Sequence, residues 1–320
     1  MERVEDLRVV AFGGGTGLPV LLRGLRDRVR DLTAVVTVAD DGGSSGRLRQ
    51  ELGVAPPGDV RNCLVALAGR KRLAEVFNYR FEAPGDLNDH SVGNIIIAAL
   101  ADMAGDFCEG VEQAARFLRI KGSVLPAAKE SLTLVVRYAD GTVTRGESVV
   151  HEVGKKVERV AVEPEGIGAP RGVIGAIGEA DVVVLGPGSL FTSTIPALLG
   201  GGVKEALARF GGPVVYVSNA MTQPGETAGF TVSDHVKAIS AHIGPIVTDV
   251  LVHAGEFSAD VLARYEAEEA APVTVDGGAL REMGLRVRNA DVLSRDDRAG
   301  VRHDPERLAR EVCGAALVRF

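Results

Sequence analysis

The stretch Val9-Val10-Ala11-Phe12-Gly13-Gly14-Gly15-Thr16-Gly17-Leu18 decides the fold. Four apolar residues lead into a glycine cluster, and apolar residues then recur at helical spacing from Leu18 to Val29. This order predicts a buried strand, a tight turn and an amphipathic helix. Because the first N–H groups of a helix lack partners and carry the positive end of the helix dipole, the turn suits an anion. We therefore predict a phosphate-binding loop that opens a doubly wound α/β sheet, with a strand–helix turn without a ligand as the alternative.

Acidic and small residues follow the second predicted strand, Leu32 to Ala39. The sequence there reads Asp40-Asp41-Gly42-Gly43-Ser44-Ser45-Gly46-Arg47. In dinucleotide-binding folds an acidic residue about 20 positions after the glycine loop accepts hydrogen bonds from ribose hydroxyls, and Asp40 and Asp41 have about that offset. The stretch is either a solvated loop or a lid ordered by a ligand, and we favour the lid.

Two further helix starts carry polar residues. Pro56-Pro57-Gly58-Asp59-Val60-Arg61-Asn62 precedes an apolar helix, with Asp59 as the expected N-cap. The helix dipole disfavours a cation in the first turn, so Arg61 is held either by an anionic ligand or by Asp40 or Asp41, or else by an ordinary ion pair. His90 stands at another helix start, where it has either a ligand or catalytic role or a structural one beside the expected cap Ser91.

Two later predicted strands also end in glycine-rich or polar stretches. Ala180–Leu185 runs into Gly186-Pro187-Gly188-Ser189-Leu190-Phe191-Thr192-Ser193, and Pro213–Ser218 runs into the polar stretch Asn219–Thr227. Open α/β sheets bind ligands at the carboxyl ends of their strands. Two glycine turns at strand ends therefore support each other as parts of one ligand site.

Short strands replace this pattern in the middle of the chain. A hairpin over Leu132–Tyr138 and Thr142–Thr144, followed by strands at Glu147–His151 and Val157–Val162, predicts a β-rich insertion at about residues 131–162. We expect its charged residues to form a solvated face. Further elements are predicted as a helix over Ser233–His242, strands over Asp249–Val252 and Val273–Val275, and a final helix that follows Arg302–Pro305 and ends near Val318.

The composition excludes several classes of protein. The 320 residues are 46% hydrophobic and carry a net charge of −7, which argues against a nonspecific nucleic-acid binder. Cys63, Cys108 and Cys313 are odd in number and widely spaced, so neither a disulfide framework nor a zinc site is expected. The charged segment Met1–Arg8 leads directly into the first strand, and no apolar run approaches the ~18 residues of a membrane span. We expect a cytoplasmic protein with no membrane span and no nucleic-acid partner.

The sequence resembles the CofD-like family along nearly its whole length. The motifs that carry the resemblance are GGGTGL at Gly13–Leu18, VTVADDGGSSGRLR at Val36–Arg49, PPGDVRNCLVAL at Pro56–Leu67, HSVGN at His90–Asn94, LGPGSLFTS at Leu185–Ser193 and NAMTQPGET at Asn219–Thr227. Within the family the sequence is most similar to the gluconeogenesis factor (YvcK-type) branch. The resemblance implies a modified Rossmann-like α/β fold, doubly wound with a mostly parallel sheet, in a single domain over residues 1–320 with the β-rich insertion at about 131–162.

The resemblance implies two classes of function. Members of the gluconeogenesis factor branch are cytoplasmic proteins linked to cell shape and cell-wall synthesis during growth on gluconeogenic carbon, and they bind UDP-N-acetylglucosamine. The related CofD enzymes transfer a phospholactyl group from a nucleotide diphosphate carrier to a deazaflavin and use magnesium. We therefore expect either a UDP-sugar-binding regulator that needs no cofactor for binding, or a magnesium-dependent 2-phospho-L-lactate transferase. An NAD(P) oxidoreductase is a weaker alternative, because the loop reads GGGTGL rather than GxGxxG. We also expect a homo-oligomer.

The resemblance further implies a set of site residues. Gly14–Thr16 is similar to the family's diphosphate cradle, and Asp40 and Asp41 would be catalytic only in a transferase. Asp40 and Asp59 are the expected metal ligands. Ala197 stands where the family often has asparagine, a departure that removes a polar side chain from that point. The residues expected to bind the ligand are Gly14, Gly15, Thr16, Ser44, Ser45, Arg47, Asp59, Arg61, Asn62, His90, Asn94, Gly188, Ser189, Asn219, Thr222 and Arg302.

Overall fold

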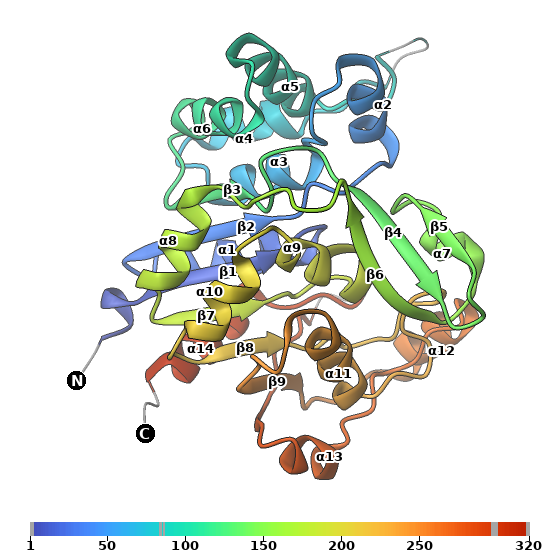
Figure 1. Cartoon of the computed structure of the whole chain (residues 1–320). Coiled ribbons are helices and arrows are strands. Elements are labelled where there is room, and N and C mark those ends of the chain that lie inside the picture. The colour runs from blue at the N-terminus through green and yellow to red at the C-terminus, as the bar shows by residue number, and fades with distance from the viewer. Residues whose placement is uncertain (1–2, 83–84, 86, 296–299, 318–320) are drawn as a thin grey trace.

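Parallel strands form the central sheet of the computed structural model, which describes residues 3–82, 85, 87–295 and 300–317. The strand order is β10-β9-β8-β7-β1-β2-β3, and every neighbouring pair is parallel (Figure 1). The strands are β1 (Arg8–Gly13), β2 (Asp31–Val36), β3 (Ser123–Pro126), β7 (Val182–Leu185), β8 (Val214–Val217), β9 (Asp249–His253) and β10 (Arg286–Ala290). This is the 3-2-1-4-5-6 order of the Rossmann fold with one strand added. The predicted Rossmann-like, doubly wound sheet is confirmed.

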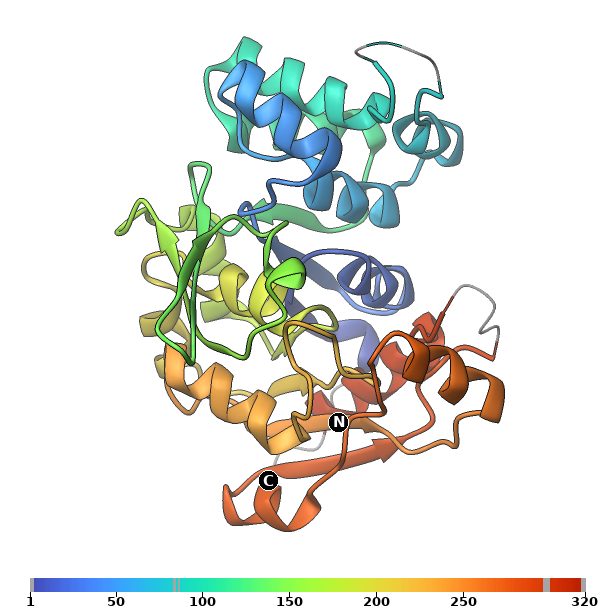
Figure 2. The ribbon, with the colours of Figure 1, turned by 90° about the vertical axis from the view of Figure 1, so that its right-hand side faces the viewer.

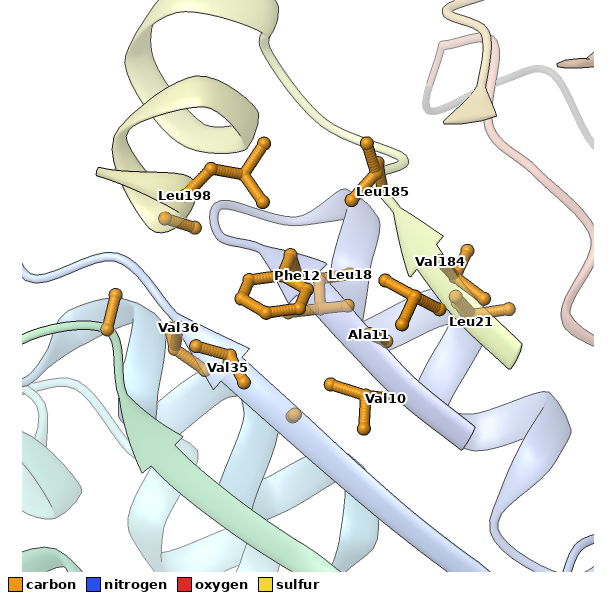
Figure 3. Close-up of a cluster of buried hydrophobic side chains, with 14 of the residues drawn as sticks. Val10, Ala11, Phe12, Leu18, Leu21, Val35, Val36, Val184, Leu185 and Leu198 are labelled. Atoms are coloured by element: carbon orange, nitrogen blue, oxygen red, sulfur yellow. The ribbon is translucent and has the colours of Figure 1, made fainter. Parts of the chain in front are cut away.

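The strand that opens the sequence motif lies in the middle of this sheet. Val9, Val10, Ala11 and Phe12 of β1 are each at most 2% exposed. Figure 3 shows β1 side chains in one cluster with those of β2 and β7, with α1 (Gly17–Leu25) and with α9 (Ile195–Leu198). Helices cover both faces of a parallel sheet, so its central strands are apolar at every position rather than at alternate ones.

Helices are arranged in three groups around the sheet (Figures 1 and 2). On one face α1 packs against α3 (Gly58–Leu67) and α14 (Pro305–Leu317). The other face carries α8 (Arg171–Glu179), α9, α10 (Val203–Arg209) and α11 (Val232–Ile243). Beyond β3 lies a helical layer of α2 (Gly43–Leu52), α4 (Lys71–Asn78), α5 (Val92–Ala104) and α6 (Phe107–Leu118). Further helical segments are η1 (Val4–Asp6), the π-helical turn η2 (Leu190–Thr194), α12 (Ala259–Ala267) and α13 (Gly277–Glu282).

The β-rich insertion forms its own antiparallel sheet. β4 (Thr133–Tyr138) pairs with β5 (Val143–Arg145) on one side and with β6 (Val157–Glu163) on the other. Figure 1 places this sheet on the side of the molecule toward which β8 points, and β6 contacts α9, α11 and η2. The strand predicted at Glu147–His151 is wrong, because the N–H groups at its start bind a carboxylate of the main domain and the short helix α7 (Val150–Val153) follows.

The stretch after β2 is not a solvated loop. Residues 43–47 form the start of α2, with Ser44 and Ser45 each 4% exposed. The small residues allow close packing rather than flexibility: a Cβ on Gly46 would lie 2.6 Å from the Asp41 carbonyl carbon, and one on Gly58 would overlap the Ser45 hydroxyl. The solvated-loop alternative is therefore wrong for this segment, and the lid stays a prediction.

Other differences are smaller. The strand predicted at Val273–Val275 is wrong, since Thr274 forms only an isolated bridge with Thr231. The last helix ends at Leu317, and Val318 lies outside the described residues. Over the described ranges, none of the helices has the length and apolar character needed to span a membrane.

Candidate ligand-binding site

Neighbouring strands end together in the polar and glycine-rich stretches that the sequence singled out. In the order β8-β7-β1-β2, the pairs Leu185 with Tyr216, Phe12 with Leu185 and Gly13 with Val36 bring the strand ends level. The chain passes from β1 to β2 on one side, while β7 lies on the other side, so the strand order reverses at β1. Open α/β sheets bind ligands at such a switch point.

A cleft of about 290 Å³ opens at this edge, and we call it the glycine-loop cleft. It is lined by Gly15–Gly17, Val20, Pro187–Ser189, Ser193, Asn219–Gln223, Tyr265, Leu293 and Val301–His303. Seven of the predicted ligand-binding residues therefore meet here: Gly15, Thr16, Gly188, Ser189, Asn219, Thr222 and Arg302. They come from four separate parts of the chain.

Backbone N–H groups around this cleft are free to bind a ligand. Among the described residues, the N–H groups of Gly14, Thr16, Gly188 and Ser189 donate no hydrogen bond. Gly15 has a φ of +60°, in the left-handed region that glycine enters without a steric penalty. Thr16 is the N-cap residue of α1, but its side chain makes no capping hydrogen bond, so its hydroxyl is also free. Free amides at a helix N-terminus suit a phosphate or diphosphate.

The loops of the cleft hold each other in position. A Cβ on Gly17 would overlap the Pro187 carbonyl oxygen, so the two glycine loops touch backbone to backbone. Buried Glu226 accepts hydrogen bonds from the backbone N–H groups of Phe191 and Thr192 at 2.5 and 3.2 Å. The role of Glu226 was not predicted, because a carboxylate that binds a distant loop leaves no local sequence pattern.

The loop after β8 is bound to the second glycine loop. Gln223 Nε2 donates to Ser189 Oγ at 2.7 Å, and Asn219 Nδ2 donates to Gln223 Oε1 at 3.0 Å. The Asn219 side-chain oxygen has no partner in the described part of the chain and so can accept a hydrogen bond from a ligand. Thr222 Oγ1 accepts from the Ala271 N–H at 3.0 Å, which gives this residue a structural role beside its place in the cleft.

A second pocket of about 310 Å³ lies between the glycine loop and the helical layer, and we call it the helical-layer pocket. It is lined by Asp40, Gly42–Ser45, Gly58, Asp59, Arg61, Asn62, Arg80, Asp89 and Asn94. Seven predicted site residues meet in it: Asp40, Ser44, Ser45, Asp59, Arg61, Asn62 and Asn94. Asp59 joins it to the glycine loop, because its Oδ2 accepts a hydrogen bond from the Gly15 N–H at 2.7 Å.

Asp59 is not the N-cap of α3. Pro57 holds that place, and Asp59 is the second helical residue, with its carboxylate turned toward the glycine loop instead of its own helix. A Cβ on Gly14 would overlap this carboxylate, so Gly14 lies against Asp59 and lines neither cavity. Burial raises the pKa of Asp59 to about 6 and also raises the pKa of Asp40.

Arg61 is buried without an ion pair. Its Nη2 donates to Asn62 Oδ1 at 2.5 Å, and no carboxylate of the described residues lies within ion-pair distance of its guanidinium. Burial lowers the pKa of Arg61 to about 10. Two of the predictions for Arg61, an ordinary ion pair and pairing with Asp40 or Asp41, are therefore wrong. The remaining prediction is that Arg61 binds an anionic ligand.

Besides Gly14, three predicted residues lie outside both cavities. Asp41 is turned to the insertion, where its Oδ1 accepts from the N–H groups of Glu147 and Ser148 at 3.0 and 2.9 Å. Arg47 donates to the Asn88 carbonyl at 2.6 Å on the surface. His90 is buried behind the helical-layer pocket, with Nδ1 3.0 Å from Ser44 Oγ, and burial lowers its pKa.

Glu147 is a further carboxyl group in this region, although the sequence predicts that it lies in solvent. The hydrogen bonds to Asp41 fix the backbone of this turn, and Glu147 Oε2 is buried without a partner among the described residues. Burial, followed by the negative charges of Asp59 and Asp40, raises the pKa of Glu147 to about 9. The expectation of a solvated face is wrong here, because Asp41 draws the turn inward.

The carboxylates of the helical-layer pocket supply part of the ligand set that a magnesium ion needs. No group of three or more His, Cys, Asp or Glu side chains in the described ranges is placed to hold a metal ion. Magnesium commonly takes one or two carboxylates and completes its shell with water and substrate phosphates. Asp40 and Asp59, two partly buried carboxylates in one pocket beside the glycine loop, match that pattern. They would hold the ion together with a bound diphosphate.

The fold and the two cavities define a Rossmann-like α/β protein with a site for an anionic ligand at the switch point of its sheet. The sequence model of 2-phospho-L-lactate transferase CofD matches residues 9–293, and the chain belongs to the CofD family. The resemblance seen in the motifs is thereby confirmed.

Relatives in the family match over almost the whole chain. The gluconeogenesis factor of Halalkalibacterium halodurans is 46% identical over 312 residues, which cover 97% of this chain and 96% of that protein. The gluconeogenesis factor of Bacillus subtilis is 45% identical over 305 residues, covering 94% and 96%. A crystal structure of a protein from Bacillus halodurans superposes with a TM-score of 0.93 at 45% identity and covers 98% of this chain and 99% of that one.

Proposed function

We propose that this protein is a cytoplasmic gluconeogenesis factor that binds UDP-N-acetylglucosamine and supports cell shape and cell-wall synthesis during growth on gluconeogenic carbon. The observation that carries the proposal is the set of free N–H groups on Thr16, Gly188 and Ser189, which line one cleft. Positioned amides and a helix dipole suffice to bind a diphosphate, and binding needs neither a nucleophile nor a cofactor. Relatives named gluconeogenesis factor support the gluconeogenic part of this proposal.

The second candidate is a magnesium-dependent transferase of a phospholactyl group from a nucleotide diphosphate carrier. The name of the matching family and the two partly buried carboxylates Asp40 and Asp59 favour it. Bound magnesium would stabilise charge on the diphosphate, and a carboxylate could accept the proton of an acceptor hydroxyl. Asp41 is a weaker candidate for that role, since its Oδ1 already accepts two backbone hydrogen bonds.

Calorimetry with UDP-N-acetylglucosamine, GDP and NADP, each with and without magnesium, separates these functions. The regulator is expected to bind the UDP-sugar most tightly and to leave it chemically unchanged. Release of UMP, or transfer of a phosphoryl-linked group to an acceptor, would contradict a pure regulator and support the transferase. Tight binding of NADP alone would contradict both.

The Thr16 hydroxyl is expected to contact the diphosphate. Thr16→Ala should weaken binding of UDP-N-acetylglucosamine at least about 10-fold, because a hydrogen bond to a charged group contributes roughly 1.5 kcal/mol. Thr142→Ala, on an exposed turn of the insertion, is the matched control and should leave the affinity unchanged. Equal affinities for Thr16→Ala and the wild type, measured by calorimetry, would argue against the cradle.

We also propose that the protein self-associates. Helices of the helical layer expose large apolar side chains, among them Met103 at 81% and Phe117 at 48%. Light scattering should give a mass above the 33.5 kDa of one chain, and a monomer at every concentration would contradict the proposal.

A further inference from the structure

The helical-layer pocket contains buried polar atoms that no described residue satisfies. Arg61 is 6% exposed, and its Nε–H has no acceptor. Asn94 is 1% exposed; its Nδ2 donates to Ser44 Oγ at 3.1 Å, whereas its Oδ1 accepts nothing. A buried donor or acceptor left unpaired destabilises the folded protein. A ligand that paired with both atoms would remove that cost.

Both side chains are held in place before any ligand arrives. A Cβ on Gly93 would lie 2.9 Å from the Arg61 Cγ and Cδ atoms, so the absence of a side chain at Gly93 makes the space that the arginine fills. Asn94 lies in α5, where its backbone N–H is bonded to the cap residue Ser91 at 3.2 Å. Binding at such a site loses little side-chain entropy, which favours affinity.

The charges in the pocket decide which chemical group fits it. Asp40 and Asp59 line the same space as Arg61 and Asn94. Arg80 and Asp89 also line the pocket, but they form an ion pair with each other. A second phosphate would meet Arg61 but would be repelled by Asp40 and Asp59. An apolar group would leave the Arg61 Nε–H and the Asn94 Oδ1 unpaired. Hydroxyl groups both donate and accept, so a polyhydroxyl group can donate to Asp40, Asp59 and the Asn94 oxygen and accept from Arg61.

The position of the pocket connects this group to a diphosphate. The Gly15 N–H donates to Asp59 Oδ2, so the wall of the helical-layer pocket is also the support of the glycine loop. The pocket therefore lies next to the loop on which we place the phosphate. Its volume of about 310 Å³ lies at the lower end of ordinary small-molecule sites.

We propose that the helical-layer pocket holds the hexose of a nucleoside diphosphate sugar and that Arg61 and Asn94 are the residues that select it. This inference rests on the proposed function, because it requires the diphosphate to lie on the glycine loop. The sugar, and not the nucleoside, then lies on the side of the loop that faces α2, α3 and α5.

Calorimetry with UDP and with UDP-N-acetylglucosamine tests this assignment on the full chain. Arg61→Gln and Asn94→Ala should each weaken binding of the UDP-sugar at least 10-fold and change binding of UDP less than twofold. Arg72→Gln and Asn78→Ala, exposed on α4, are the matched controls and should change neither affinity. If Arg61→Gln does not fold, as judged by thermal unfolding, Arg61→Lys keeps the charge, lacks the Nε–H and should show the same selective loss.

The outcomes separate this inference from the proposed function. If the wild type binds UDP and the UDP-sugar equally, or if the variants weaken both ligands alike or neither, the sugar assignment is overturned while nucleotide binding stands. If the wild type binds neither ligand, the proposed function fails and the sugar assignment fails with it.

Discussion

Gly17→Ala is expected to lower the affinity for UDP-N-acetylglucosamine at least 100-fold and the free energy of unfolding by about 1–3 kcal/mol. A Cβ on this residue would overlap the Pro187 carbonyl oxygen and lie 2.7 Å from its carbonyl carbon and 3.1 Å from the Gly188 nitrogen. Backbone atoms cannot rotate away as a flexible side chain can, so the two glycine loops must separate. Their free N–H groups would then no longer converge on one anion. Calorimetry and urea unfolding measure the two effects.

Gly314→Ala is the matched control for this substitution. Gly314 lies in α14, and a Cβ there would meet no atom within 4 Å. Alanine is the better helix former, so this variant should gain up to about 1 kcal/mol of stability and keep the wild-type affinity. If Gly17→Ala were as stable as Gly314→Ala and bound the ligand equally well, the contact between the two loops would have no role in the site.

Asp59→Asn is expected to stabilise the ligand-free protein at pH 7 by an amount on the order of 2–3 kcal/mol. Burial raises the pKa of Asp59 from 3.8 to about 6, so between these values the folded protein keeps a proton that the unfolded chain has lost. The stabilisation that this proton gives the folded protein is complete below about pH 4 and is lost as the pH rises through 6. Asparagine keeps an oxygen that accepts from the Gly15 N–H but carries no charge, so the variant should lose this pH dependence.

Urea unfolding at pH 4.5 and pH 7.5 measures this effect. The stability gain of Asp59→Asn should be larger at pH 7.5, and magnesium-dependent binding of a nucleotide diphosphate should weaken. Asp140→Asn is the control, because this exposed carboxylate has its pKa lowered by Lys155 and should show no gain at the higher pH. A loss of stability in Asp59→Asn at pH 7.5 would mean that the carboxylate is held by a cationic partner in the ligand-free protein.

The sequence predicts the parts of the fold that have a strong local pattern. β1, β7 and β8 are continuous apolar runs that end in glycine or polar residues, and all three were placed within a few residues. β3 and β10 were missed, because they are edge strands whose residues alternate in burial or stay half-exposed. α2 was taken for a loop, since glycine and serine are poor helix formers; here their small size allows the helix to pack closely on Asp41 and Gly58.

The sequence predicts which residues belong to the candidate site, but not how they are divided between the two cavities. The motifs contain the residues that line both cavities, yet no spacing in the sequence distinguishes Asp40, which lines the helical-layer pocket, from its neighbour Asp41, which holds the insertion. Glu147 and Glu226 were not predicted to face this region, because their burial depends on residues far away in the chain. Long-range contacts of this kind decide which of several polar residues reach a ligand.

A crystal structure of the protein with UDP-N-acetylglucosamine is the most direct test of the central claim, that backbone amides at the carboxyl edge of the sheet bind the diphosphate. We expect phosphate oxygens within hydrogen-bond distance of the Thr16 and Ser189 N–H groups, with the strand ends of β1 and β7 directly beneath them. A nucleotide bound at the opposite edge of the sheet, with the glycine-loop cleft closed by side chains, would contradict it.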